Sequence, residues 1–347
     1  MESRKVQRVG YSTFSVSLPK EWVKTSGIKQ GDLVMLFPEK DGSLKLLPSG
    51  MVERRTQTEG YIIDSDLCSA PGLLERLIVG NYILGRDIIS VVSSTRISRM
   101  NVDEVRKIAH RLMGLGIVQE TPDRIDLQCS IDATRFKIDM LLRRLSVIAS
   151  TIFTEALEAL TESNQQMADD AIRREDEADM MYWLSLRLLL SAQRDRTTMD
   201  KIGLQEPSQI LYYGLISRYL ELIGDRSEYI AHRAIEFMSR SKQKTSKSVM
   251  NRISNMGELA HNVFLKAMDC VFTGNIEVAN DLLEIARAIR REHDSLLKEL
   301  PEHVVLRTIA WEIDRIADHG ASIAVIAINL ALERPSNICY SEIPART

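Results

Sequence analysis

Two pairs of carboxylates, each spaced four residues apart, are the feature of this 347-residue chain most able to do chemistry. They occur in two similar segments, RYLELIGDRSEYIA at 218–231 and WEIDRIADHGASIA at 311–324, which align at a constant offset of 93 residues. The pairs are Glu221 with Asp225 and Asp314 with Asp318. A constant offset over a whole helix indicates an internal duplication. Acids at this spacing share one helix face and repel each other, so the duplication predicts a compensating cation.

Another helical segment in each half offers further acids. In the first half, RREDEADMMYW at 173–183 places Glu175 and Asp179 at the same four-residue spacing. Its counterpart in the second half, RAIRREHDSLL, keeps Asp294 but has Arg290 where the other acid would stand. We therefore expect a group of four carboxylates in the first half and an incomplete group in the second.

Three explanations for these carboxylates stay open. A solvated helix face is common, and a neighbouring arginine such as Arg226 or Arg315 could neutralise a pair. A metal is the third, because helical bundles build metal sites from inward carboxylates, and oxygen ligands favour Mg²⁺, Mn²⁺, Ca²⁺ or iron. The candidate metal ligands are Glu175, Asp179, Glu221 and Asp225 in the first group and Asp294, Asp314 and Asp318 in the second.

The elements that position these acids are long helices. Helical spacing of apolar residues continues from residue 133 almost to the end, interrupted by the polar, basic stretch SRSKQKTSKS. The predicted helices are 134–160, 164–194 and 206–238 in the first half and 248–273, 275–298 and 301–333 in the second. Three helices per half predict two three-helix bundles, at 133–240 and 247–335.

The remaining chain divides into two smaller parts. Residues 1–52 contain short β-type runs around KEWVKT, with Pro19 suited to the first turn of a helix and Gly27 to its end. A module of this size holds little core, so dimerisation is expected. Residues 60–132 follow the order β-α-β-α-β-β, with Asn101 as a helix cap, and predict a small α/β domain of unknown role.

Charge is distributed unevenly along the chain. Residues 1–30 carry six basic and two acidic side chains, a net +4, within a chain of net charge −3. A basic end on an acidic body is typical of a segment that meets a polyanion, although solvated basic clusters are common. The four cysteines show no CxxC spacing, so we expect neither a disulfide framework nor a zinc knuckle. This cysteine usage is typical of a protein in a reducing cytoplasm. No apolar run approaches the roughly 20 residues of a membrane span, and we expect no membrane insertion.

The helical part, about residues 134–333, resembles the PhoU family of phosphate-signalling proteins, which are built from two tandem three-helix bundles. The family motif of an acid, three residues and then Asp appears here as ELIGD and DRIAD, the latter followed by His319 and SIA. The resemblance implies multinuclear metal clusters on the bundles. Tyr229 and Ser322 stand where Asn is common, and Arg290 replaces an expected acid.

The N-terminal stretch STFSVSLPKEWVKTSGIKQGDLVML resembles the SpoVT/AbrB-type DNA-binding module, a swapped-hairpin β-barrel formed by two chains. The Leu-Pro-Lys turn, the short helix and Gly31-Asp32 are in register over about residues 3–48. The resemblance implies that basic side chains face DNA phosphates. The candidates are Arg4, Lys5, Arg8, Lys20 and Lys24.

Together these features predict a multidomain, mainly α protein: an N-terminal AbrB-like swapped-hairpin barrel, a small α/β domain and C-terminal tandem PhoU-like bundles. The combination resembles an archaeal class of phosphate uptake regulators. We expect a cytoplasmic, homodimeric DNA-binding regulator of phosphate homeostasis whose bundles bind iron, zinc, manganese or magnesium. The alternative is an adaptor that docks a phosphate transporter or signalling kinase without reading DNA. An enzyme is not expected, because GxSxG, HExxH, P-loop and GxGxxG signatures are all missing from the sequence.

Overall fold

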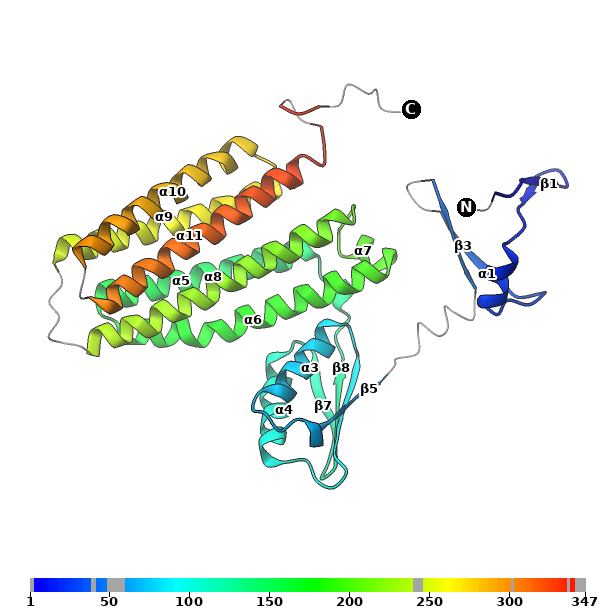
Figure 1. The fold of residues 1–347 in the computed structure, drawn as a ribbon, viewed down its shortest axis with the longest axis horizontal. Coiled ribbons are helices and arrows are strands. Elements are labelled where there is room, and N and C mark those ends of the chain that lie inside the picture. Colours follow the sequence, from blue (N-terminus) through cyan, green and yellow to red (C-terminus); the bar gives the residue numbers. More distant parts are fainter. Residues whose placement is uncertain are drawn as a thin grey trace. The chain divides into compact units, whose positions relative to one another are not determined.

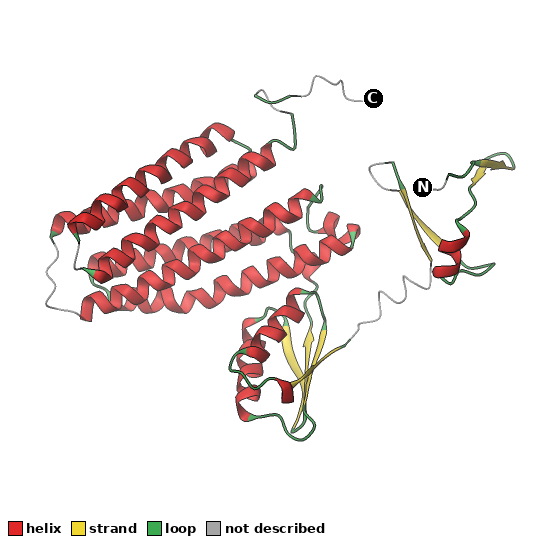
Figure 2. Ribbon diagram, in the orientation of Figure 1, coloured by secondary structure: helices red, strands yellow, loops and turns green. Residues whose placement is uncertain are grey.

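The computed structural model of the chain describes residues 3–38, 42–48, 60–239, 246–300, 303–335 and 338–340. The chain forms two compact units, Met1–Glu59 and Gly60–Thr347, which are described separately below (Figure 1). Strands occur in the N-terminal unit and in the first part of the second unit, and the elements described after residue 132 are all helices (Figure 2). The predicted fold class, mainly helical with small N-terminal strand hairpins, is confirmed.

The N-terminal unit consists of two antiparallel hairpins with a short helix between them. Strand β1 (Gln7–Val9) pairs with β2 (Thr13–Ser15), helix α1 spans Lys20–Thr25, and β3 (Val34–Pro38) pairs with β4 (Leu44–Pro48). Pro19 stands at the N-cap of α1, and Gly27 takes the positive φ that ends the helical turn. These elements lie where the sequence predicts them.

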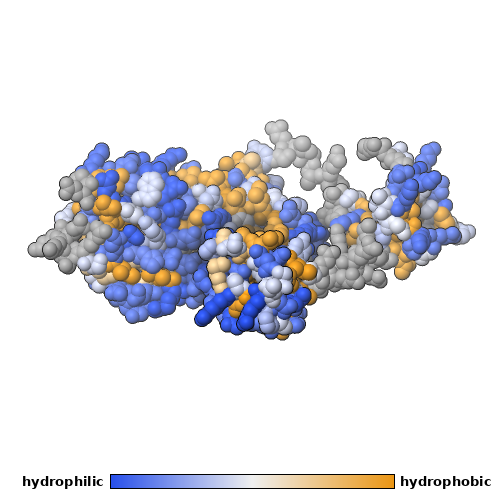
Figure 3. Space-filling model, turned by 60° about the horizontal axis from the view of Figure 1, so that its bottom comes forward, coloured by the Kyte–Doolittle hydropathy of each residue, from blue (hydrophilic) through white to orange (hydrophobic). Residues whose placement is uncertain are grey.

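The hairpins of a single chain leave their apolar side chains at the surface. Val6, Phe14 and Leu33 expose 67%, 69% and 76% of their area, and Pro48 is the one buried residue in the described part of this unit. Hydrophobic atoms are accordingly visible on the surface of the unit in Figure 3. The described strands form two separate two-stranded sheets and no closed barrel. The described part of a single chain therefore does not form the predicted barrel.

The second unit begins with a four-stranded sheet that carries two helices on one face. Its elements are β5 (Tyr61–Asp64), the 3₁₀ turn Ser65–Leu67, α3 (Leu73–Ile83), β6 (Ile88–Val92), α4 (Arg99–Arg111), β7 (Leu115–Thr121) and β8 (Arg124–Cys129). The strand order is β5-β6-β8-β7, with β5 parallel to β6 and the other pairs antiparallel. Apolar side chains of alternate strand positions, among them Ile89, Val91 and Leu127, form a core against α3 and α4.

The N-cap of helix α4 lies three residues before the predicted one. Ser98 is the N-cap, and its hydroxyl accepts a hydrogen bond from the backbone N–H of Asn101. The Asn101 side chain is buried and donates to the carbonyl of Ser65 at 3.2 Å. The predicted capping role of Asn101 is therefore wrong, because its amide holds the 3₁₀ turn after β5.

Six long helices and one short helix follow. They are α5 (Ile138–Glu162), α6 (Gln165–Arg194), α7 (Arg196–Lys201), α8 (Ser208–Ser239), α9 (Lys247–Thr273), α10 (Ile276–Glu299) and α11 (Val304–Ala331). The short helix α7, which Asp195 caps, was not predicted from the sequence. The predicted linker 239–248 lies between α8 and α9, and its residues 240–245 are outside the described part of the chain. Pro301, the predicted start of the last helix, is also outside the described residues.

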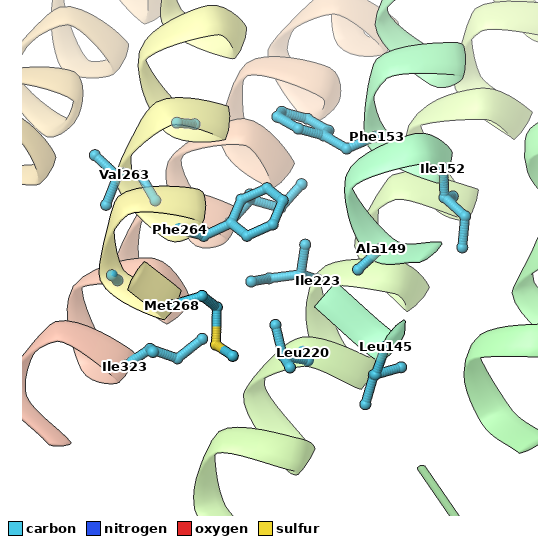
Figure 4. Close-up of a cluster of buried hydrophobic side chains, with 14 of the residues drawn as sticks. Leu145, Ala149, Ile152, Phe153, Leu220, Ile223, Val263, Phe264, Met268 and Ile323 are labelled. Atoms are coloured by element: carbon cyan, nitrogen blue, oxygen red, sulfur yellow. The ribbon is translucent and has the colours of Figure 1, made fainter. Parts of the chain in front are cut away.

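The two groups of three helices share one continuous hydrophobic core. Side chains from α5 and α8 meet those from α9 and α11, as Phe153, Ile223, Phe264 and Ile323 show in Figure 4. Because these helices supply apolar residues both to their own bundle and to its neighbour, the bundles pack as one body.

Gly320 allows α11 to approach α9 closely. A Cβ atom at this position would lie 2.9 Å from the backbone N and Cα of Phe264, which cannot move aside.

We expect Gly320→Ala to lower the free energy of unfolding by about 1–3 kcal/mol. The matched control is Gly214→Ala on α8, where the nearest atom to a new Cβ is 3.9 Å away. This control should gain about 0.5–1 kcal/mol from helix propensity. Urea unfolding followed by circular dichroism measures both; equal effects would contradict the close approach.

Candidate functional site

Three predicted metal ligands come together on the surface of the first bundle. Glu175 and Asp179 lie one turn apart on α6, and Asp225 faces them from α8. One carboxylate oxygen from each lies within 4.8 Å of the other two. The Glu175 and Asp179 side chains are only 15% and 14% exposed. These three residues are called the acidic centre below.

Burial and mutual repulsion raise the pKa values of the acidic centre. Burial, followed by the charge of Asp179, raises the pKa of Glu175 to about 8. Burial raises the pKa of Asp179 to about 6, against the opposing charge of Arg111, and burial also raises the pKa of Asp225. Burial therefore disfavours the charged form of these carboxylates unless a cation joins them. An oxygen-only donor set of this kind fits a hard metal cation.

Glu221, the fourth predicted ligand of this group, lies outside the three-carboxylate centre. Its carboxylate is buried and accepts hydrogen bonds from Arg218, one turn earlier on α8. Burial and the charge of Asp225 nevertheless raise the pKa of Glu221 to about 7. Glu228, which was not predicted, also adds negative charge next to Glu175 and Asp225.

A guanidinium from the α/β part reaches the acidic centre. Arg111, the last residue of α4, donates to Asp179 at 2.8 Å and lies 2.8 Å from Asp176. It lies 3.7 Å from a carboxylate oxygen of Glu175 and 3.7 Å from one of Glu75. Sequence reasoning missed Arg111, because the residue lies more than 60 positions before its partners on α6 and outside both repeats.

The second predicted group is organised differently. Arg290 of α10 bridges Asp314 and Asp318 of α11, with its Nε 2.7 Å from a carboxylate oxygen of Asp314. Asp294 is largely exposed and pairs with His293. In the described part of the chain these three acids form no group like the acidic centre. An arginine thus supplies here the cation that the paired acids require.

The two repeats meet at equivalent positions. Arg226 of α8 donates from Nε to the imidazole of His319 on α11 at 2.9 Å and from Nη1 to Glu312 at 2.6 Å. The ring of Tyr219 lies 5.6 Å from that of His319. Burial, reinforced by nearby arginines, lowers the pKa of His319 to about 4, so the neutral ring accepts the hydrogen bond. Arg226 and His319 occupy equivalent positions of the two repeats, 93 residues apart, and so do Tyr219 and Glu312. This is expected of repeats that face each other.

The raised pKa values predict an acid-stabilised apo protein. Between a pKa of about 4.5 in the unfolded chain and about 8 in the folded one, Glu175 takes up a proton on folding, so stability falls as pH rises through this range. We expect Glu175→Gln to flatten this dependence and to stabilise the metal-free chain at about pH 8. Thermal unfolding in the presence of a chelator, over a pH series, measures the effect. Glu177→Gln, an exposed change on the same helix, should leave the curve unchanged.

The predicted DNA-binding residues all lie at the surface of the N-terminal unit. Arg4 and Lys5 precede β1, Arg8 lies within β1, and Lys20 and Lys24 lie on α1. The guanidinium of Arg8 also donates to the carbonyl of Tyr11 in the β1–β2 turn. Exposed basic groups close to a strand edge and a short helix suit contacts with phosphates.

Comparisons with known proteins match both parts of the chain. The PhoU domain matches residues 142–234 and 253–327, and the MazE bacterial antitoxin family, described as antidote-toxin recognition, matches residues 7–54. The chain is also similar to the crystal structure of PhoU from Pseudomonas aeruginosa, with 17% identity and a TM-score of 0.47. That similarity covers 57% of this chain and 96% of the other. No curated protein matches the chain.

These matches establish the class of each part. Both matched families are regulatory, non-catalytic families. The chain contains PhoU domains in its helical part and a MazE/AbrB-type domain at its N-terminus. The two resemblances seen in the sequence are thereby confirmed. Among the described helices, none is both long and apolar enough to cross a membrane.

Proposed function

We propose that the protein is a DNA-binding transcriptional regulator of phosphate uptake and homeostasis, with its PhoU domains as the sensing part. The observation that carries this proposal is the presence in one chain of a MazE/AbrB-type domain with exposed basic residues and PhoU domains with an acidic centre. PhoU domains suggest phosphate-homeostasis regulation, and the N-terminal domain is compatible with DNA binding.

The exposed apolar surface of the N-terminal unit supports dimerisation through this unit. A second copy would cover side chains such as Phe14, Leu33 and Leu36, which a single chain leaves 60–76% exposed. The basic residues of two chains would then lie on one dimer and double the number of phosphates that are neutralised. Each neutralised phosphate releases a counterion, so binding should weaken steeply as salt rises.

The acidic centre would hold the metal ion. Glu175, Asp179 and Asp225 would supply its oxygen ligands, and iron, zinc, manganese and magnesium are the candidate ions. A bound cation would neutralise the negative charge of the centre. Arg290 already provides a positive charge for Asp314 and Asp318, so we propose an ion pair rather than a metal in the second repeat.

A regulator of this kind needs coupling between its two parts. The sensing part must favour one of two states of the protein that differ in their affinity for DNA, and the same coupling requires DNA to alter affinity at the sensor.

The test is enrichment of sheared genomic DNA from the source organism on the purified protein at two salt concentrations, followed by sequencing. Enrichment upstream of phosphate-transport genes, weaker at the higher salt, would support the proposal. An absence of enrichment at both concentrations would overturn the DNA-reading role. It would favour an adaptor that docks a phosphate transporter or signalling kinase and uses its N-terminal unit only to dimerise.

A further inference from the structure

Arg111 connects the α/β part to the acidic centre through two of the carboxylates that a metal would use. Its guanidinium donates to Asp179 at 2.8 Å and lies 3.7 Å from Glu175, both of which belong to the centre. Asp176 and Glu75 also pair with it, and only 18% of the Arg111 side chain is exposed. Arg111 is therefore held as a cation by acids of both α6 and the α/β part.

The second repeat shows the same solution from within its own bundle. Arg290 on α10 bridges Asp314 and Asp318, and the position equivalent to it on α6 is Glu175. The first bundle has no arginine at this position, and α4 delivers one from outside the repeat. A guanidinium thus lies at Glu175 and Asp179 on α6 and another at Asp314 and Asp318 on α11, but only in the first repeat does it come from the α/β part.

The contact between α6 and the α/β part has a second anchor that is independent of the acidic centre. Arg187, one turn from Trp183 along α6 toward its C-terminus, donates to the carbonyls of Tyr82 and Arg86 at the end of α3. Trp183 packs against the α/β core between these two anchors, and the Arg111 guanidinium lies 5.3 Å from its ring centroid. Displacement of Arg111 would therefore release one end of the interface and leave the other held.

We propose that Arg111 is an exchangeable cation, which a metal ion entering the acidic centre displaces, so that metal binding frees the α4 end of the α/β part from α6. This inference rests on the proposed metal site. Two cations held at the same carboxylates repel each other, and a divalent ion brings more charge to the centre than one guanidinium. The α/β part, residues 60–132, thereby gains a role: its attachment to α6 depends on whether a metal ion occupies the acidic centre.

The test uses the full chain and Mn²⁺ or Zn²⁺ as separate probes. Arg111→Gln removes the competing charge and should tighten binding of the ion by about tenfold or more in calorimetric titration. The matched control is Arg106→Gln, on the same helix, where an exposed arginine pairs with Glu120 instead. This control should bind the ion as the wild type does. Asp225→Asn in the Arg111→Gln chain should lose binding, which would assign the ion to the acidic centre.

Amide hydrogen exchange provides a readout that needs no substitution. In the wild type, adding the ion should speed exchange in residues 99–116 and leave α3 near Arg187 protected. In Arg111→Gln, exchange there should already be fast and should not change with the ion. Equal affinities in wild type and Arg111→Gln, with unchanged exchange, would overturn the displacement and leave the metal site standing. An absence of binding of both ions to both chains would overturn the metal site and the displacement together.

Discussion

Substitution of Arg4, Lys5 and Arg8 together by glutamine is expected to weaken DNA binding by about 100-fold or more at low salt. All three side chains are exposed in the described structure, before or within β1, and each substitution removes a charge that would neutralise a phosphate. A dimer would lose six such charges. The slope of log affinity against log salt should fall by about 0.9 for every phosphate that the variant no longer neutralises. Fluorescence anisotropy with a labelled duplex over a salt series measures both quantities.

The control for this prediction removes the same charge elsewhere. Arg96, Arg99 and Lys107 are exposed residues in and before α4 of the second unit. Their joint replacement by glutamine changes the net charge equally and should leave affinity and salt slope close to those of the wild type. If the two triple variants behaved alike, long-range charge rather than the N-terminal surface would account for binding. If neither changed binding, the assignment of the DNA-binding residues would fail.

Loss of Arg187 is expected to destabilise the α/β part by about 3 kcal/mol. This buried guanidinium donates to the carbonyls of Tyr82 and Arg86 at 2.6 and 3.2 Å and pairs with Asp87. In Arg187→Ala these acceptors at the C-terminal end of α3 would lose their charged donor inside the interface. Hydrogen exchange of residues 60–132 should accelerate relative to the helical bundles.

Two variants test how specific this effect is. Arg194→Ala removes an exposed arginine in the last turn of the same helix and should change little. Arg187→Lys keeps the positive charge but lacks the planar fork of donors, so it should restore only part of the protection. If Arg187→Ala exchanged like Arg194→Ala, Arg187 would contribute nothing measurable, and the α/β part would be held by Arg111 and by apolar packing around Trp183.

The arrangement of elements along the chain could be predicted well from local patterns. Apolar periodicity placed each of the six long helices close to its observed bounds, and glycine, proline and polar stretches marked the turns between them. The short helix α7 could not be predicted, because six residues are too few to show a helical period of apolar residues. Asn101 was predicted as a helix cap because asparagine side chains commonly cap helices. The same amide can instead donate to a backbone carbonyl far away in the sequence, here that of Ser65.

The residues of the acidic centre could be predicted only in part. A four-residue spacing places two acids on one face of a helix, so Glu175 with Asp179 could be identified as a pair. Which acid of α8 would face that pair depended on the rotation and crossing of two packed helices. The structure selects Asp225 and leaves Glu221 with Arg218.

The sequence by itself determined the helices, the duplicated acid pairs, the basic N-terminal surface and the need for cations beside the carboxylates, because these depend on neighbours within a few residues. Only the tertiary structure decided which cation lies beside which carboxylates: Arg290 at Asp314 and Asp318, and Arg111 of the α/β part at Glu175 and Asp179. The physical reason is that a charge contact acts through space over a few ångströms. Residues 111 and 179 come within that distance only when the α/β part packs against α6.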